Sequence, residues 1–285
     1  MALNKLRQAQ FKLFRLLEPR AVFEWQSHFL LRPLLKRLPK GDGHSVVVFP
    51  GFGSSDRATR PLRSLLTELG YDTHGWGLGS NILFDHELES EMIALVDEVY
   101  RSSGRKVSLV GWSLGGIYAR EVAKACKDKV RCVVTLGSPI SGNTEHTHAH
   151  VLYQALNGKP SKIDVSRYMS LNSAPDVPTT SIYSKSDGIV AWEGSVQQTG
   201  EFTENIEVPA SHLGIGVNPL AMYLVADRLS QEEEKWKRFD TKGLKGLVYK
   251  KPTKRTKKRL FGENSAASDK STASDNSVVS DNSAA

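Results

Sequence analysis

Residues 108–119 read SLVGWSLGGIYA, and this stretch decides the fold class. The run KVSLV predicts a buried strand, and GIYAREVAKA after it predicts a helix. Between them Gly111, Ser113 and Gly115 form the pattern Gly-x-Ser-x-Gly. A serine at such a turn has strained backbone and holds its hydroxyl out above the carboxyl end of the sheet. Side chains at the two glycines would collide with the neighbouring strand and helix. The alternative is a glycine-rich turn in which Ser113 only caps the helix.

From residue 41 onward the chain alternates predicted strands with predicted helices. The strand-like runs are SVVVFPGFG, the weaker YDTHGWGL, KVSLVGW, VRCVVTLGSP, PTTSIYSKSD and ENIEVPASH. The helical runs include residues 59–69, with Thr59 as the cap, and a segment begun by Asn218. Such an alternation implies right-handed crossovers. We therefore predict an α/β fold with a mostly parallel sheet and helices on both faces.

Composition divides the chain into three parts. Residues 1–40 form a basic segment with amphipathic helical periodicity, and residues 41–240 form the α/β domain. Within that domain, one connection is longer than neighbouring strands need, which predicts a small cap insertion at about 141–177. Residues 241–285 are basic at first and then rich in Ser and Asp. We expect this tail to be disordered, since it cannot bury enough apolar area to offset its ordering entropy.

A serine hydroxyl needs a general base before it can attack. On this kind of turn, the partners of the serine follow in chain order as an acid and then a histidine. Four histidines come after Ser113, and three of them, His146, His148 and His150, precede every candidate acid. His212 lies in a loop directly after a predicted strand. We therefore predict His212 as the base, with an ordinary surface histidine as the alternative.

Asp187 is the candidate acid. It follows the strand-like run PTTSIYS directly and lies 25 residues before the candidate histidine. Asp176, Glu201 and Glu204 fall at the other end of the predicted sheet. Asp187 would orient the imidazole and stabilise its charged form without itself taking the proton. Its alternative role is to cap the turn at Gly188.

Two backbone amides are candidates for an oxyanion hole. The Leu114 N–H lies at the positive end of the helix that follows the serine. The second donor should come from the glycine-rich loop FPGFGSS after the first buried strand. We choose the N–H of Phe52, with Gly53 as the second choice.

Two further groups of residues are less specific. Three tryptophans flank the predicted site, namely Trp76, Trp112 and Trp192. They either wall a substrate pocket or pack in the core, and the sequence leaves both open. The run TEHTHAHVL at 144–152 spaces its histidines as zinc ligands on a strand would be spaced. It lacks strand character, so we interpret it as a polar loop and predict no metal site.

The segments VVVFPGFGSS, GWSLGG, TLGSPISG, YSKSDGIV and VPASHLG together resemble an α/β-hydrolase of the bacterial esterase/lipase type. The resemblance covers about residues 44–230. It implies Ser113 as nucleophile, Asp187 as acid and His212 as base, with the Phe52 and Leu114 amides as oxyanion donors. Many lipases of this type begin the oxyanion loop with His-Gly, where this chain has Pro-Gly.

The resemblance and the triad pattern predict hydrolysis of a small-molecule acyl ester through an acyl-enzyme, without a metal or organic cofactor. An acyltransferase would use the same residues and pass the acyl group to an alcohol other than water. The alternative from another class is a catalytically inert, hydrolase-like binding scaffold. The presence of nucleophile, acid and base together argues against this alternative, because a scaffold has no need to retain all three.

The charge is concentrated at the two ends. Residues 1–40 hold nine Lys/Arg against two Glu, and residues 235–285 hold thirteen against five acidic residues. Residues 41–234 are acidic, with sixteen against twenty-four. Because the globular middle is acidic and carries no nucleic-acid-binding motif, we predict no nucleic-acid partner. The basic ends leave peripheral contact with an anionic membrane surface open. A self-packed N-terminal helix with a solvated tail is the favoured alternative.

The two cysteines, Cys126 and Cys132, read as buried free thiols, since nothing else in the chain suggests an oxidising compartment. The N-terminus has no uninterrupted apolar stretch of the signal-peptide type. We therefore expect a cytoplasmic protein, with peripheral attachment to the inner membrane face left open.

Overall fold

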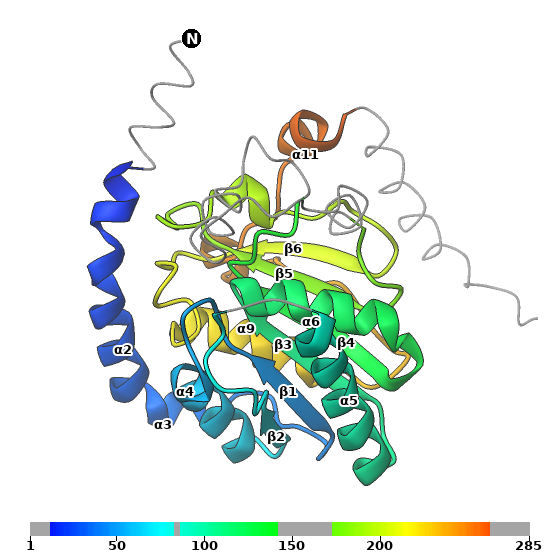
Figure 1. The fold of residues 1–285 in the computed structure, drawn as a ribbon. Helices are drawn as coiled ribbons and strands as arrows, with labels where there is room; N and C mark the ends of the chain where they lie inside the picture. The colour runs from blue at the N-terminus through cyan, green and yellow to red at the C-terminus, as the bar shows by residue number, and fades with distance from the viewer. Residues whose placement is uncertain (1–11, 83–85, 142–172, 263–285) are drawn as a thin grey trace, which may run out of the picture.

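The computed structural model describes residues 12–82, 86–141 and 173–262 (Figure 1). In these residues, six parallel strands form one sheet in the order β2-β1-β3-β4-β5-β6. The strands are β1 (Ser45–Phe49), β2 (Asp72–Gly75), β3 (Val107–Trp112), β4 (Val130–Leu136), β5 (Thr179–Tyr183) and β6 (Thr203–Glu207). The order reverses between β1 and β3. The loops after these two strands therefore meet at the carboxyl edge, where open α/β sheets bind their ligands.

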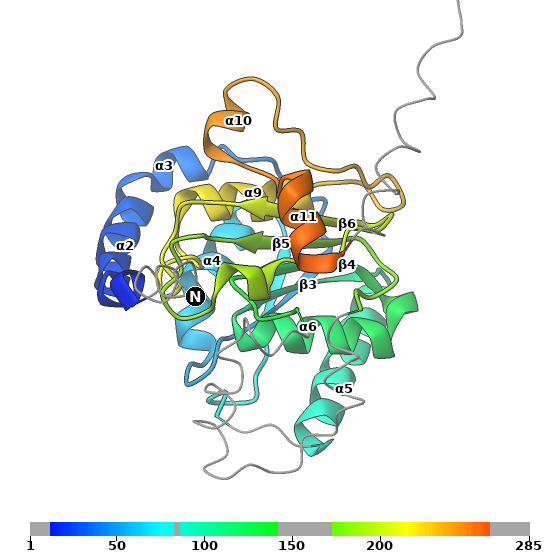
Figure 2. The same cartoon turned by 90° about the horizontal axis from the view of Figure 1, so that it is seen from above.

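Helices cover both faces of the sheet, as Figures 1 and 2 show. The four long ones are α4 (Asp56–Glu68), α5 (His86–Ser103), α6 (Leu114–Ala125) and α9 (Pro219–Leu229). Residues of α5 and α6 form one apolar cluster with one face of the sheet, and residues of α4 and α9 form a second cluster with the other face. The predicted α/β class, with helices on both faces, is confirmed, and the described sheet is wholly parallel.

Shorter helices lie at the two ends of the chain and in the loops. They are η1 (Glu18–Arg20), α2 (Ala21–Leu30), α3 (Arg32–Leu35), η2 (Lys127–Lys129), η3 (Trp192–Ser195), α10 (Lys245–Val248) and α11 (Lys254–Phe261). The N-terminal helices α2 and α3 pack against α9. An ion pair of 2.8 Å between Arg32 and Glu68 joins α3 to α4.

The sequence explains why the central elements form. β1 reads SVVVF with every residue buried, as expected of a parallel strand covered on both faces. In α4 the leucines at 62, 65 and 66 recur at helical spacing and are all buried, while Arg57, Arg60 and Glu68 are exposed. The N-cap Asn218 of α9 accepts hydrogen bonds from the amides of Leu220 and Ala221, as the predicted start at that residue requires.

The predicted start of the helix at 59–69 is wrong by three residues. α4 begins at Asp56 with Ser55 as its N-cap, and Thr59 lies inside the helix. The Asp56 carboxylate accepts hydrogen bonds of 3.0 Å from the amides of Trp76 and Gly77. This contact with the chain after β2 holds the first turn in place, and no local sequence signal announces it.

Part of the predicted tail belongs to the folded domain. Tyr249 is 6% exposed and lies in the apolar cluster of α9, with its ring stacked 5.6 Å from that of Tyr223. The backbone of Lys250 forms a bridge with Glu207 at the outer strand β6. The boundary predicted at residue 240 therefore falls inside the packed structure. The sequence does not reveal this anchor, because Tyr249 lies within a run of basic residues that predicts a solvated tail.

Several other predictions lie outside the described residues. These are the first part of the N-terminal helix, most of the cap insertion and the Ser/Asp-rich end of the chain. Cys126 and Cys132 are buried and unpaired, in agreement with the sequence analysis.

A buried imidazole ties together the amino ends of β1 and β3. The His44 ring is fully buried and contacts Ser108 Oγ at 2.8 Å and Asp42 Oδ1 at 2.5 Å. Asp42 also accepts from Arg105 and Arg131. Burial lowers the pKa of His44, against the raising effect of the hydrogen bond to Asp42. The folded chain therefore excludes a proton that the unfolded chain binds in mild acid.

We expect the free energy of unfolding to fall as the pH drops from about 7 to about 5, because the unfolded His44 takes up a proton there. His44→Gln should reduce the slope of stability against pH by up to ~1.4 kcal/mol per pH unit. Ser108→Ala removes a partner of the ring but keeps the titrating group, so it should lower stability and preserve the slope. Urea denaturation at a series of pH values measures both quantities. An unchanged slope in His44→Gln would contradict this explanation.

Candidate active site

Three predicted side chains meet at the carboxyl edge of the sheet. Ser113 follows β3, Asp187 lies in the loop after β5 and His212 lies in the loop after β6. The Ser113 hydroxyl lies 3.0 Å from His212 Nε2, and His212 Nδ1 lies 2.7 Å from Asp187 Oδ2. With the proton on Nδ1, the ring donates to the carboxylate and accepts from the hydroxyl. Each of the three residues is 3% exposed.

The backbone at Ser113 is strained. Its φ of 53° and ψ of −121° lie outside the regions that non-glycine residues ordinarily occupy. A Cβ at Gly111 would lie 2.2 Å from the Gly115 carbonyl oxygen, and one at Gly115 would lie 2.4 Å from the Phe49 carbonyl oxygen. The sharp turn therefore depends on both glycines, for the steric reason that the sequence analysis gives.

Asp187 is held on both of its oxygens. While Oδ2 faces His212, Oδ1 accepts hydrogen bonds from the amides of Ile189 at 2.8 Å and Val190 at 2.7 Å. Gly137, which follows β4 with a φ of 56°, leaves room for this pair. A Cβ there would lie 3.1 Å from Asp187 Oδ2 and 3.3 Å from the His212 ring. The carboxylate is thus fixed in an orientation that can hold the imidazole.

The loop after β1 is braced by Asn81, which the sequence analysis does not single out. Its side chain is fully buried and donates to the Pro50 carbonyl at 2.8 Å, while its backbone carbonyl accepts from the Gly53 amide at 2.7 Å. The Gly53 amide is therefore engaged. The Phe52 amide makes no hydrogen bond within the described parts of the chain. Leu114 is the first residue of α6, so its amide has no intrahelical acceptor.

The three tryptophans occupy different environments. Trp112 is half-buried, donates from Nε1 to the His212 carbonyl at 3.1 Å and so contacts the histidine loop. Trp76 is 1% exposed and stacks on Tyr118 in the core. Trp192 stacks on Tyr183 at 5.9 Å. Among the residues that the structure describes, Trp112 is the one of these three tryptophans that contacts a predicted catalytic residue, His212.

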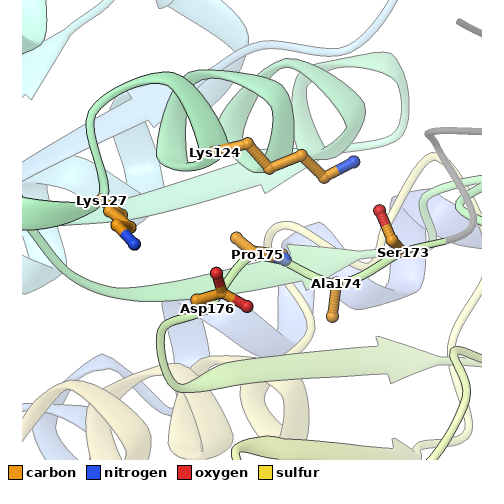
Figure 3. Close-up of a pocket in the computed structure, with 6 residues that line it drawn as sticks. All are labelled: Lys124, Lys127, Ser173, Ala174, Pro175 and Asp176. Atoms are coloured by element: carbon orange, nitrogen blue, oxygen red, sulfur yellow. The ribbon is translucent and has the colours of Figure 1, made fainter.

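A surface hollow of about 240 Å³ lies elsewhere (Figure 3). It is lined by Lys124, Lys127, Ser173, Ala174, Pro175 and Asp176. These residues lie where α6 ends and before β5 begins, at the amino edge of the sheet and opposite Ser113. The hollow is therefore separate from the candidate site.

The histidine run at 144–152 lies outside the described residues, so its predicted loop character is not addressed. Among the residues that are described, no group of three or more His, Cys, Asp and Glu side chains is arranged to hold a metal ion.

Comparisons with known proteins place the chain in a family. Residues 22–250 match the sequence profile described as the alpha/beta hydrolase family. A curated relative, pimeloyl-[acyl-carrier protein] methyl ester esterase of Shewanella woodyi, is 29% identical over 101 residues, which are 34% of this chain and 37% of the relative. The chain thus matches little more than a third of that relative's length.

A solved structure shares the fold at low sequence identity. Lipase B of Aspergillus fumigatus is 19% identical with a TM-score of 0.51, over 68% of this chain and 54% of the lipase. A monoacylglycerol lipase of Paleococcus ferrophilus is 16% identical with a TM-score of 0.48, over 65% of this chain and 93% of that one. The matched profile spans most of the chain and includes the six described strands and the four long helices that cover the sheet. The chain therefore belongs to the α/β hydrolase family.

Proposed function

We propose that the protein is a serine hydrolase that cleaves carboxylic esters through an acyl-enzyme. The observation that carries this proposal is the hydrogen-bonded chain from Ser113 through His212 to Asp187. Membership of the α/β hydrolase family supports hydrolase chemistry. The similar proteins described above, an esterase and a lipase, support an ester as the substrate.

In the first half of the proposed reaction, His212 Nε2 takes the proton of Ser113 as Oγ bonds to the substrate carbonyl carbon. The carbonyl electron pair moves onto its oxygen, which the amides of Phe52 and Leu114 receive. The imidazolium then gives its proton to the ester oxygen as the carbon–oxygen bond breaks. The alcohol leaves, and the acyl group stays on Ser113.

In the second half, water replaces the alcohol. His212 takes a proton from the water as its oxygen attacks the acyl carbon, and the same two amides hold the new oxyanion. The tetrahedral intermediate collapses with return of that proton to Ser113 Oγ, which releases the carboxylic acid. Protein groups handle each proton and electron pair, so the proposal calls for no metal or organic cofactor.

Asp187 has a supporting electrostatic role in this scheme. Its carboxylate selects the imidazole tautomer that leaves Nε2 free to accept the serine proton, and it stabilises the imidazolium that forms. In serine hydrolases, loss of the equivalent carboxylate lowers turnover by about 10⁴-fold. Loss of one oxyanion donor costs about 3–4 kcal/mol of barrier. Since a 10⁴-fold loss corresponds to about 5.4 kcal/mol, loss of the acid should cost more than loss of one oxyanion donor.

Acyl transfer to another alcohol uses the same residues, and no described contact favours it over hydrolysis. The inert scaffold is disfavoured because Ser113 occupies a strained backbone conformation. Strain of that kind costs about 1–3 kcal/mol. A binding module has no use for a destabilising serine conformation aimed at a histidine.

We expect Ser113→Ala to abolish hydrolysis of short-chain p-nitrophenyl esters, with a fall in kcat of at least about 10³-fold. The reason is that no other hydroxyl takes the place of the nucleophile. Ser181→Ala is a matched control, because Ser181 is also a buried serine but bonds to the Ser195 carbonyl away from the site. Initial rates across ester chain lengths provide the measurement. Equal rates in the wild type and Ser113→Ala would remove the enzymatic proposal.

We also propose that the N-terminal segment rests on an anionic membrane surface, at the cytoplasmic face. Nine large apolar side chains of this segment are at least 41% exposed: Leu13, Leu16, Leu17, Val22, Phe23, Phe29, Leu30, Leu31 and Leu34. Basic side chains are exposed on the same segment at Lys12, Arg15, Lys36, Arg37 and Lys40. Lys and Arg near an anionic surface contribute about 1 kcal/mol each. Apolar area beside a net positive charge fits a bilayer interface.

The two acidic residues of the segment, Glu18 and Glu24, are too few to cancel the charge of its nine Lys and Arg residues. Both also accept hydrogen bonds from loops of the α/β domain. Leu213, next to the candidate base, is 47% exposed, and its amide donates to Glu18, which brings the apolar segment beside the site. Within the described residues, no helix is long and apolar enough to cross a bilayer. Attachment would therefore be peripheral.

We expect the protein to sediment with vesicles that contain phosphatidylglycerol, but not with pure phosphatidylcholine vesicles, at low salt. Phe23→Ser combined with Leu30→Ser should lower the bound fraction at least about tenfold, because each change removes apolar area that the bilayer would bury. Leu244→Ser is the control, since Leu244 is 83% exposed but lies outside the segment. Failure of anionic vesicles to bind the intact protein would exclude this attachment.

A further inference from the structure

The two loops that carry Asp187 and His212 share a third partner, the turn η1 near the N-terminus. The sequence profile of the family begins at residue 22, so this turn lies outside the matched range. Two of its residues, Glu18 and Arg20, reach loops that are more than 160 positions away in the chain. Glu18 is 4% exposed, an unusual environment for a carboxylate unless it is well paired.

Glu18 accepts hydrogen bonds from the backbone of both loops. Its Oε1 lies 2.8 Å from the Gly188 amide and 3.0 Å from the His212 amide. Its Oε2 lies 3.0 Å from the Leu213 amide. One buried carboxylate thus holds the residue directly after the acid together with the base itself. Hydrogen bonds to a charged acceptor are about twice as strong as neutral ones.

Arg20 supplies the complementary donors to the same two loops. Its guanidinium donates to the Ser186 carbonyl and, at 2.9 Å, to the Ser186 hydroxyl, next to the acid. It also donates to the Ala210 carbonyl at 3.0 Å, two residues before the base. Glu18 therefore accepts hydrogen bonds from backbone amides, and Arg20 donates hydrogen bonds to backbone carbonyls. Each of them bridges the acid loop and the base loop.

The backbone of the N-terminal segment also lies against the acid loop. A Cβ at Gly188 would lie 2.5 Å from the Phe14 carbonyl group, so the two chains approach as closely as a glycine allows. On the base loop, Glu24 of α2 accepts from the Ser211 amide at 3.0 Å and from the Asn218 side chain at 2.8 Å. The clasp, defined as Glu18, Arg20 and Glu24, therefore grips the base loop at both of its ends.

We propose that Glu18 and Arg20 are positioning residues that set the separation of the Asp187 carboxylate and the His212 imidazole. Within the described residues, the side chains of Ser184 and Ser186 link the acid loop directly to the Ala210 backbone, on the strand side of both catalytic residues. Beyond that point, apart from the bond between Asp187 and His212 itself, the bridging hydrogen bonds come from the clasp. Its catalytic consequence rests on the proposed function, while its effect on the loops does not.

The physical effect is preorganisation. A displacement of about 1 Å in a catalytic group can lower turnover about 10²-fold. Loosening these contacts should therefore lower kcat and leave KM nearly unchanged, because the hydrogen bonds of Glu18 and Arg20 go to the acid and base loops and not to Ser113 or the oxyanion loop. It should also raise local opening of the two loops without affecting the sheet.

Glu18→Gln is the primary variant. It preserves the size of the side chain but leaves one acceptor oxygen for three amides, with an NH₂ group facing a donor. Arg20→Lys is the second variant, because a single ammonium cannot reproduce the bridging guanidinium. Glu68→Gln is the matched control. It breaks the ion pair that anchors the same N-terminal segment to α4, but has no recorded contact with either catalytic loop.

The experiment combines ester kinetics with amide hydrogen exchange and thermal melting. In Glu18→Gln and Arg20→Lys, we expect kcat to fall about 10- to 100-fold with KM within about twofold of wild type. In Glu18→Gln, the amides of Gly188, His212 and Leu213 should exchange at least about tenfold faster, while amides of β3 and β4 keep their rates. Glu68→Gln should resemble the wild type in all of these measurements.

Unchanged loop exchange in Glu18→Gln, or acceleration of loop and sheet amides together with a lower melting temperature, would overturn the positioning role. A wild type without Ser113-dependent turnover would instead remove the proposed function. The exchange data would then still decide whether the clasp holds the two loops.

Discussion

The site depends on one backbone constraint, the left-handed turn at Ser113 between β3 and α6. The turn brings the helix so close to the strands that Gly111 and Gly115 have no room for a side chain. In return, it lifts the hydroxyl to the carboxyl edge and leaves the Leu114 amide at the start of a helix. In the proposed mechanism, this single local strain thus supplies both the nucleophilic hydroxyl and one of the two oxyanion donors.

The parallel sheet supplies the partners. Because every described strand runs in the same direction, the loops after β1, β3, β5 and β6 emerge at one edge. His212 then comes within hydrogen-bonding distance of Ser113, which is 99 positions away in the chain, and of Asp187, which is 25 positions away. The loops need further support, since their backbone is not part of the sheet. Asn81 braces the loop after β1, and Glu18 and Arg20 bridge the loops after β5 and β6.

The strand-and-helix order and the positions of Ser113, Asp187 and His212 could be predicted because they follow from local periodicity, turn chemistry and chain order. The residues that the sequence did not reveal act over long distances. In the sequence, nothing distinguishes Asn81 and Glu18 from other amide and carboxylate side chains. Their roles appear only in the fold, where both are buried against backbone groups of distant loops. For the same reason, the start of α4 was misplaced: the contact that fixes Asp56 comes from the chain after β2. Tyr249 was hidden in a run of lysines that suggested a solvated tail.

The most direct test of the site is the structure of the protein after reaction with an alkyl p-nitrophenyl phosphonate, which mimics the tetrahedral intermediate. We expect a covalent bond from Ser113 Oγ to phosphorus, and a phosphoryl oxygen about 2.7–3.1 Å from the amide nitrogens of Phe52 and Leu114. His212 should remain within hydrogen-bonding distance of the serine oxygen. A phosphonate bound to another residue, or a phosphoryl oxygen turned away from both amides, would contradict the assignment of these groups.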